Sequence, residues 1–126
     1  MEKTDTLSVV RAYHQGWTGK NFETSEKLLA SELRVEVPIN EYPDRESFGK
    51  ALEGFGSMTR GVKLLAEFAD GDEAMLLYDM EVEHLGMLRV AEHFTVCEGK
   101  ITRIRQIHDT AALRSSGFAG SASSES

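Results

Sequence analysis

Hydrophobic side chains recur every three or four positions between residues 4 and 19, where Leu7, Val10, His14 and Trp17 share one side with Tyr13 beside them. This period predicts an amphipathic helix, and the preceding "TDT" offers oxygens for its N-cap. A break at "GKN" is followed by "NFETSEKLLA", which predicts a shorter second helix with Phe22, Leu28 and Leu29 inward.

A third helix is predicted after Pro43. Asp44 can cap it, and its inward positions are Phe48, Leu52 and Phe55, until Gly56 or Gly61 stops it. Between the second and third helices, "LRVEVP" alternates apolar and charged residues up to Pro38, the pattern of a half-buried strand.

The second half of the chain alternates with a period of two. The runs "VKLLAEFA", "EAMLLYDMEVE", "MLRVAEHFTV" and "KITRIRQIHD" are separated by the turn sequences "DGDE", "HLG" and "CEGK". Helices at the front and a strand meander behind predict an α+β fold, with three N-terminal helices packed on a curved antiparallel sheet.

Strand parity assigns the inward side chains. One side of "MLLYDMEVE" holds Leu76, Tyr78, Met80 and Val82, and the other holds the acids Asp79, Glu81 and Glu83. The inward row of the next strand is Leu88, Val90, Glu92, Phe94 and Val96, opposite Arg89, His93 and Thr95. A carboxyl group, that of Glu92, therefore faces an apolar interior.

The last strand needs a change of phase, because Ile101 and Ile104 are three positions apart. A β-bulge would supply it and would turn Ile104, Gln106 and His108 inward and Arg103 and Arg105 outward. A strand without the bulge would bury the arginines at a larger cost, so the bulged version is favoured.

Composition limits the classes of function. The 126 residues contain 14 basic and 21 acidic side chains, a formal charge of −7 without a basic cluster, which disfavours nucleic acid. The single cysteine, Cys97, excludes an internal disulfide and is expected to be a packed thiol. There is no signal sequence and no apolar run of about 20 residues, so we expect a cytoplasmic protein that does not enter a membrane.

The order of these elements, with "RAYHQGWTGKNFETSEKLLASELRVEVP", "PDRESFGKALEGF" and "AEHFTVCEGKITRIRQIHDTAAL", resembles the NTF2-like superfamily, in its SnoaL-like and ketosteroid-isomerase-like branch. The resemblance implies one cone-shaped domain over residues 1–114, followed by a Ser/Gly/Ala tail over residues 115–126. It also implies an apolar pocket at one end of the cone and a homodimer formed through the outer face of the sheet.

Carried over to this chain, the family's catalytic pattern is partial. Tyr13 falls at the position of the tyrosine that binds the oxyanion in ketosteroid isomerases, and Glu92 at that of the protonated acid, while Val37 stands where the base aspartate is expected. The residues that limonene epoxide hydrolases use are replaced by Gln106, Val35 and Val37. For SnoaL-like cyclases, His108 or Asp109 is the nearest candidate base.

These considerations predict a pocket for a small apolar molecule, without a cofactor or a metal. In an isomerase, cyclase or dehydratase, Tyr13 and Glu92 would donate hydrogen bonds to an oxyanion and His108 would carry the proton. The other predicted lining residues are Trp17, Val35, Val37, Tyr78, Met80, Leu88, Val90, Ile104 and Gln106. The alternatives are a non-catalytic ligand carrier or sensor, favoured by Val37, and a dimeric adaptor protein.

Overall fold

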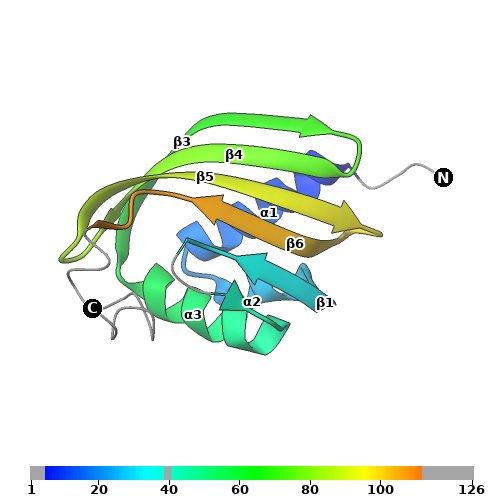
Figure 1. Cartoon of the computed structure of the whole chain (residues 1–126), viewed down its shortest axis with the longest axis horizontal. Helices are drawn as coiled ribbons and strands as arrows, with labels where there is room; N and C mark the ends of the chain where they lie inside the picture. Colours follow the sequence, from blue (N-terminus) through cyan, green and yellow to red (C-terminus); the bar gives the residue numbers. More distant parts are fainter. Residues whose placement is uncertain (1–4, 39–40, 112–126) are drawn as a thin grey trace.

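The computed structural model describes residues 5–38 and 41–111, and it contains three helices and six strands (Figure 1). In chain order the elements are α1 (Thr6–Thr18), α2 (Phe22–Lys27), β1 (Leu29–Glu36), β2 (Glu41–Tyr42), α3 (Arg45–Ser57), β3 (Thr59–Asp70), β4 (Glu73–Val82), β5 (Gly86–Cys97) and β6 (Lys100–Ile107). The predicted α+β class, with helices on one side of a curved sheet, is confirmed. The predicted tail, residues 115–126, lies outside the described residues.

The sheet is mixed, and the prediction of an antiparallel sheet was wrong in this detail. Its strand order is β2-β1-β6-β5-β4-β3, and all neighbours are antiparallel except β1 and β6, which run parallel. Strand β1 also begins at Leu29, earlier than predicted, so Leu29 belongs to a strand and not to the second helix. The apolar run Leu28–Ala30 is compatible with the end of a helix or the start of a strand. The chain forms a strand here because Leu29 pairs with Ile101 of β6.

The bulge predicted in the last strand is present. Arg103 pairs with Thr95 and Ile101 pairs with Val96, so that Thr102 is the extra residue between two paired positions. Ile101 and Ile104 are consequently both fully buried, and Arg103 and Arg105 are exposed. This phase turns Gln106 toward the helix side of the sheet.

Helix α1 lies on the concave side of the sheet, and two contacts fix its orientation (Figure 1). The Gly16 backbone lies so close to α2 that a Cβ atom there would be 2.4 Å from the Ser25 hydroxyl oxygen. That hydroxyl donates to the Tyr13 carbonyl oxygen over 2.6 Å. Ser25 is fully buried, so it pins the helical turn that carries Tyr13.

Helix α3 closes the concave side at the other end of the sheet (Figure 1). Its predicted cap is present, because the Asp44 carboxylate accepts a hydrogen bond from the Ser47 amide over 2.8 Å. The inward residues Phe48 and Leu52 are buried, as the spacing predicted. The edge of α3 that they form becomes one wall of the cavity described below.

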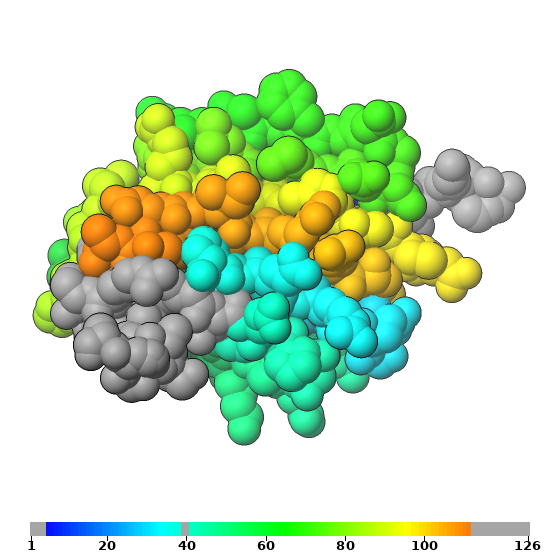
Figure 2. All heavy atoms as spheres, in the orientation of Figure 1, coloured from blue at the N-terminus to red at the C-terminus, as the bar shows by residue number. Residues whose placement is uncertain are grey.

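The outer face of the sheet is turned toward the viewer in Figure 2, and the blue of α1 is almost wholly hidden behind it. Arg89 forms the expected cross-strand ion pair with Asp79, at 2.6 Å. Between such charged pairs, Phe68, Met75 and Ile107 are 70%, 41% and 71% exposed. Cys97 is also exposed, contrary to the prediction of a packed thiol, because it ends β5 at the turn.

Within residues 5–38 and 41–111, none of the helices has both the length and the apolar content that crossing a bilayer requires.

Candidate active site

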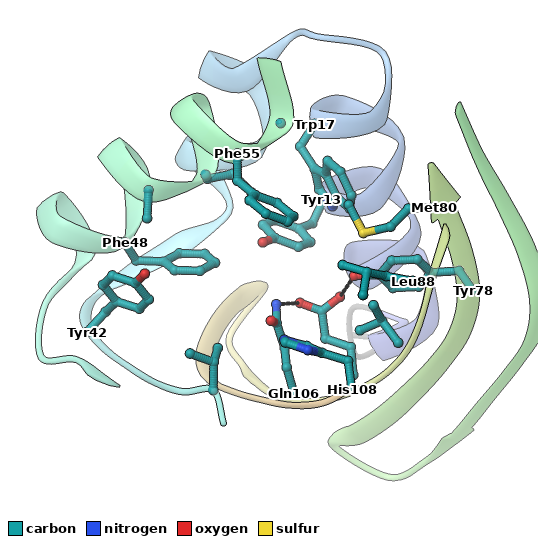
Figure 3. A pocket seen from close by; sticks show the side chains of 16 residues that line it. Tyr13, Trp17, Tyr42, Phe48, Phe55, Tyr78, Met80, Leu88, Gln106 and His108 are labelled. Carbon is teal, nitrogen blue, oxygen red and sulfur yellow. Dashed lines mark hydrogen bonds between the residues drawn. The ribbon is translucent and has the colours of Figure 1, made fainter. Parts of the chain in front are cut away.

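A cavity of about 140 Å³ lies between the concave face of the sheet and helices α1 and α3 (Figure 3). Its walls are mostly aromatic and aliphatic, and few polar groups enter it, which is the usual composition of a small-molecule site. The lining residues are Tyr13, Trp17, Val37, Tyr42, Phe48, Ala51, Leu52, Phe55, Gly56, Tyr78, Met80, Leu88, Val90, Glu92, Gln106 and His108.

Glu92 is the buried acid of this cavity. It is 1% exposed, and the register of β5 places it directly opposite Leu76 on one side and Gln106 on the other. The Tyr78 hydroxyl donates to its Oε1 over 2.8 Å and the Gln106 amide donates to its Oε2 over 2.8 Å (Figure 3). In the described part of the chain, no basic side chain forms an ion pair with Glu92.

Burial raises the pKa of Glu92 from 4.5 to about 7, while the hydrogen bonds from Gln106 and Tyr78 act in the opposite direction. The opposition is expected, because burial penalises the charged form and donors to both oxygens stabilise it. The result is a carboxyl group that exists in both protonation states near neutral pH. Such a group can both accept and return a proton, which is the requirement for general acid-base catalysis.

Two cavity-lining residues of α1 carry a further buried polar group each. The Tyr13 hydroxyl and the Trp17 indole nitrogen are buried and have no hydrogen-bond partner among the described residues. Burial, and secondarily the charge of Glu92, raises the pKa of Tyr13 well above 10, so its hydroxyl keeps its proton. Buried donors without a hydrogen-bond partner are uncommon, because an unsatisfied donor lowers the stability of the fold. Beside a cavity, an acceptor atom of a ligand can satisfy them.

The three predicted catalytic residues all line the cavity, but they differ in surroundings. Tyr13 and Glu92 are fully buried, whereas His108 is half-buried, and its Nδ1 lies 3.1 Å from the Asp109 carbonyl oxygen. His108 follows the end of β6 at Ile107. Its imidazole therefore belongs to the part of the cavity nearest to solvent.

Most of the predicted lining residues line the cavity, and two do not. Trp17, Val37, Tyr78, Met80, Leu88, Val90 and Gln106 contribute to its walls. Val35 and Ile104 are instead packed in the core, with 2% and 0% exposure, because neighbouring core side chains cover them completely. The inward parity predicted for them was correct, but it does not distinguish a packed position from one that borders a hollow.

One wall was not anticipated from the sequence. It comes from β2 and α3 and consists of Tyr42, Phe48, Ala51, Leu52, Phe55 and Gly56. The inward face of α3 was predicted, so the signal for part of this wall was available. Gly56 allows a close approach, because a Cβ atom there would lie 2.5 Å from the Phe22 ring.

His14 is buried beside the cavity without lining it. Its ring packs against those of Tyr78 and Trp17, with ring centroids 4.8 and 5.5 Å away. Burial lowers the pKa of His14 from 6.5 to about 4, so this imidazole is neutral at physiological pH. It supports the positions of Tyr78 and Trp17 by packing.

The described residues contain no group of three or more His, Cys, Asp or Glu side chains arranged to hold a metal ion. Glu92 and His108 are the only members of these residue types that line the cavity within residues 5–38 and 41–111. This set is smaller than the three protein ligands of a typical catalytic zinc site.

Comparison with known proteins gives a family and a set of related structures. The SnoaL-like domain family matches residues 10–104. A search of curated proteins gave no match.

Among solved structures, a protein from Kribbella flavida DSM 17836 has a TM-score of 0.82 and 31% identity, covering 95% of this chain and 97% of that chain. An NTF2-like protein from Cytophaga hutchinsonii ATCC 33406 has a TM-score of 0.78 and 18% identity over 90% and 96% of the two chains. An LEH-like epoxide hydrolase of M. tuberculosis has a TM-score of 0.74 and 21% identity over 95% and 94%. Ketosteroid isomerase-like structures are also among the neighbours. With identities of 18%, 21%, 19% and 16%, all of these structures except the first support the fold alone.

Proposed function

Because the chain belongs to the SnoaL-like family of the NTF2-like superfamily, we propose that its cavity is the active site of a cofactor-independent enzyme that moves a proton next to a carbonyl group. The observation that carries this proposal is Glu92, an acid that is buried, held by two neutral donors and without a counter-ion among the described residues. Isomerases, cyclases and dehydratases all need a group of this kind, with a pKa near the working pH.

Glu92 is the proton carrier in this proposal. Tyr78 and Gln106 direct their donors at its two oxygens, an arrangement that suits the carboxylate and leaves it able to accept a proton from a ligand. The carboxylate removes a proton from the carbon beside the carbonyl, and the C–H electron pair forms a C=C bond as charge moves to the oxygen. Return of the proton to another carbon completes an isomerisation without an oxidant or a reductant.

Tyr13 stabilises the oxyanion that forms in this step. Its hydroxyl is buried and protonated, and it has no hydrogen-bond partner in the part of the chain that the structure describes. A donor that is already in place and shielded from water favours the charged intermediate without reorganisation. His108, at the more exposed part of the cavity, exchanges protons between Glu92 and solvent in this scheme.

The size of the cavity limits the substrate. A volume of about 140 Å³ is close to the ~150 Å³ of a protein cavity that holds one benzene ring. We therefore propose a substrate whose reacting part is a single ring or a chain of similar size. A larger substrate would have to extend beyond this cavity.

The test uses 3-cyclohexen-1-one, a one-ring ketone whose double bond moves into conjugation when a proton is shifted. Proton NMR in D₂O detects both the double-bond shift and deuterium incorporation. The proposal predicts turnover by the wild type, loss of most of the rate in Glu92→Gln, and a rate that declines below about pH 7 as Glu92 becomes protonated. Equal rates in wild type and Glu92→Gln would refute the role of this carboxyl.

A second candidate function is a non-catalytic ligand carrier, and Val37 favours it. Val37 lines the cavity at the position where the resemblance expects the base aspartate of ketosteroid isomerases. A carrier would bind a ketone without exchanging its protons for deuterium. Saturable binding with no exchange, in wild type and in Glu92→Gln alike, would decide for this function.

We also propose that two copies pair through the outer face of the sheet. Phe68 and Met75 are directly paired neighbours on β3 and β4, and both are exposed, as is Ile107 on β6. Burial of this apolar surface is the driving force for association. Sedimentation is expected to give a dimer for wild type and a monomer for Phe68→Glu with Ile107→Lys, and a wild-type monomer at high concentration would refute the pairing.

A further inference from the structure

Trp17 is the second residue of α1 that lines the cavity and carries a buried donor without a partner among the described residues. Trp17 is 4% exposed, lines the cavity, and its Nε1 has no hydrogen-bond partner among the described residues. An indole N–H can only donate, whereas a tyrosine hydroxyl can donate or accept. The group that satisfies Trp17 must therefore be an acceptor.

Trp17 and Tyr13 are four residues apart on the same helix, so their side chains are neighbours on one face. Figure 3 shows both rings reaching into the cavity from α1. Glu92 does not accept from these two groups, since neither the Tyr13 hydroxyl nor the Trp17 Nε1 has a hydrogen-bond partner among the described residues. The wall formed by α1 thus presents two donors, neither of which has a partner among the described residues.

Charge narrows the class of ligand further. Among the described residues, no lysine or arginine lines the cavity, and an anionic ligand would lie near the carboxyl group of Glu92. An ammonium ion would suit Glu92 and the aromatic walls, but it would leave the Trp17 donor unsatisfied. A neutral molecule with an oxygen acceptor satisfies the donors without an added charge.

We propose that the indole N–H of Trp17 is a hydrogen-bond donor to the ligand and, together with Tyr13, selects neutral carbonyl compounds over hydrocarbons and ammonium ions of the same size. This rests on the proposed function insofar as the cavity is taken to be the ligand site, but it does not require catalysis. Trp17 would then determine specificity as well as form part of the wall.

Trp17 is the only tryptophan of the chain, so a ¹⁵N-labelled sample gives one indole N–H signal. We compare 2-cyclohexen-1-one with cyclohexene, which has the same ring but no oxygen, and with tetramethylammonium. The enone is expected to move the indole proton downfield and to slow its exchange with solvent. Cyclohexene is expected to do neither.

The matched variants are Trp17→Phe, which removes the donor and keeps an aromatic ring, and Phe48→Leu, which alters the opposite wall without touching a donor. Trp17→Phe should weaken enone binding about 2- to 10-fold, the range for one neutral hydrogen bond, and leave cyclohexene binding unchanged. Phe48→Leu should weaken both alike. Cyclohexene binding also shows whether each variant retains the cavity.

The inference is overturned if the enone leaves the indole signal in place or does not bind, if Trp17→Phe weakens both ring compounds equally, or if tetramethylammonium binds more tightly than the enone. Its failure can be told from failure of the proposed function. Turnover of 3-cyclohexen-1-one with an unchanged indole signal would leave catalysis standing and remove the donor role. A downfield shift of the indole signal without turnover would support the donor role and remove the catalytic proposal.

Discussion

Replacing Glu92 by glutamine is expected to change the pH dependence of stability in a defined direction. The introduced amide has the shape of the carboxyl group but does not ionise. Its oxygen can accept from the Tyr78 hydroxyl, and its NH₂ group can donate to Gln106 once that side-chain amide is turned over. Glu92→Gln therefore removes the charge of Glu92 while the hydrogen bonds of the site can be kept.

The magnitude follows from the pKa of Glu92, which burial raises from 4.5 to about 7. Between these two pH values the folded protein binds this proton more tightly than the unfolded chain does. The wild type is therefore most stable, as far as Glu92 is concerned, below pH 4.5, and it loses stability as the pH rises through 7. At about 1.4 kcal/mol for each tenfold difference in proton affinity, the loss is about 3 kcal/mol.

Urea unfolding of wild type and Glu92→Gln from pH 4.5 to pH 8 measures this effect. The free energy of unfolding of the variant minus that of the wild type should rise by about 3 kcal/mol across the range. Other groups that titrate in this range, including Glu26 and His14, are present in both proteins and cancel in the difference. A difference that stays constant with pH would refute the raised pKa and the role assigned to Glu92.

Three further expectations concern single side chains. Tyr13→Phe removes a buried, unpartnered hydroxyl, so thermal and urea unfolding should show a gain of about 1 kcal/mol while turnover of 3-cyclohexen-1-one declines about 100-fold; a loss of stability would mean that the hydroxyl has a partner. His14 must stay neutral to remain buried, so its contribution to the free energy of unfolding, measured as wild type minus His14→Phe, should fall by about 2 kcal/mol between pH 7 and pH 4.5; the opposite contribution of Glu92 is present in both proteins and cancels. Asp44→Ala removes the cap of α3 and should lower the midpoint of urea unfolding, whereas Asp44→Asn should leave it nearly unchanged.

The sequence predicted the environment of Glu92 because alternation along a strand is a local signal. Once the apolar row of β5 is assigned to the interior, Glu92 must lie in it. The bulge in β6 was predictable for a related reason, since no regular strand can bury both Ile101 and Ile104. These two inferences together predict that Glu92 and Gln106 lie on the same side of the sheet.

The partners of Glu92 were not predicted, because they depend on the register between strands. Gln106 lies directly opposite Glu92, and Tyr78 lies two positions beyond the residue that pairs with it on β4. A count outward from the "HLG" and "CEGK" turns could have given both neighbours. The parallel pairing of β1 with β6 has no comparable signal, since these strands are far apart in the chain.

The alternation of apolar and polar residues along a strand also does not show whether an inward side chain is packed in the core or borders the cavity. Val35 and Val37 both have the inward parity of β1 and its extension, yet Val35 is enclosed by the core and Val37 borders the cavity. The difference is set by where α3 and β2 close over the sheet. Tyr42 joins the cavity wall from β2, a two-residue strand too short to give a pattern.

The most direct test of the central claim, that a buried carboxyl group in the cavity holds its proton near neutral pH, is a ¹³C NMR titration of the side-chain carboxyl of Glu92, assigned by comparison with Glu92→Gln. We expect a midpoint near pH 7 that moves when 2-cyclohexen-1-one binds. A midpoint near 4.5, unchanged by the enone, would contradict both the buried acid and its place in the proposed reaction.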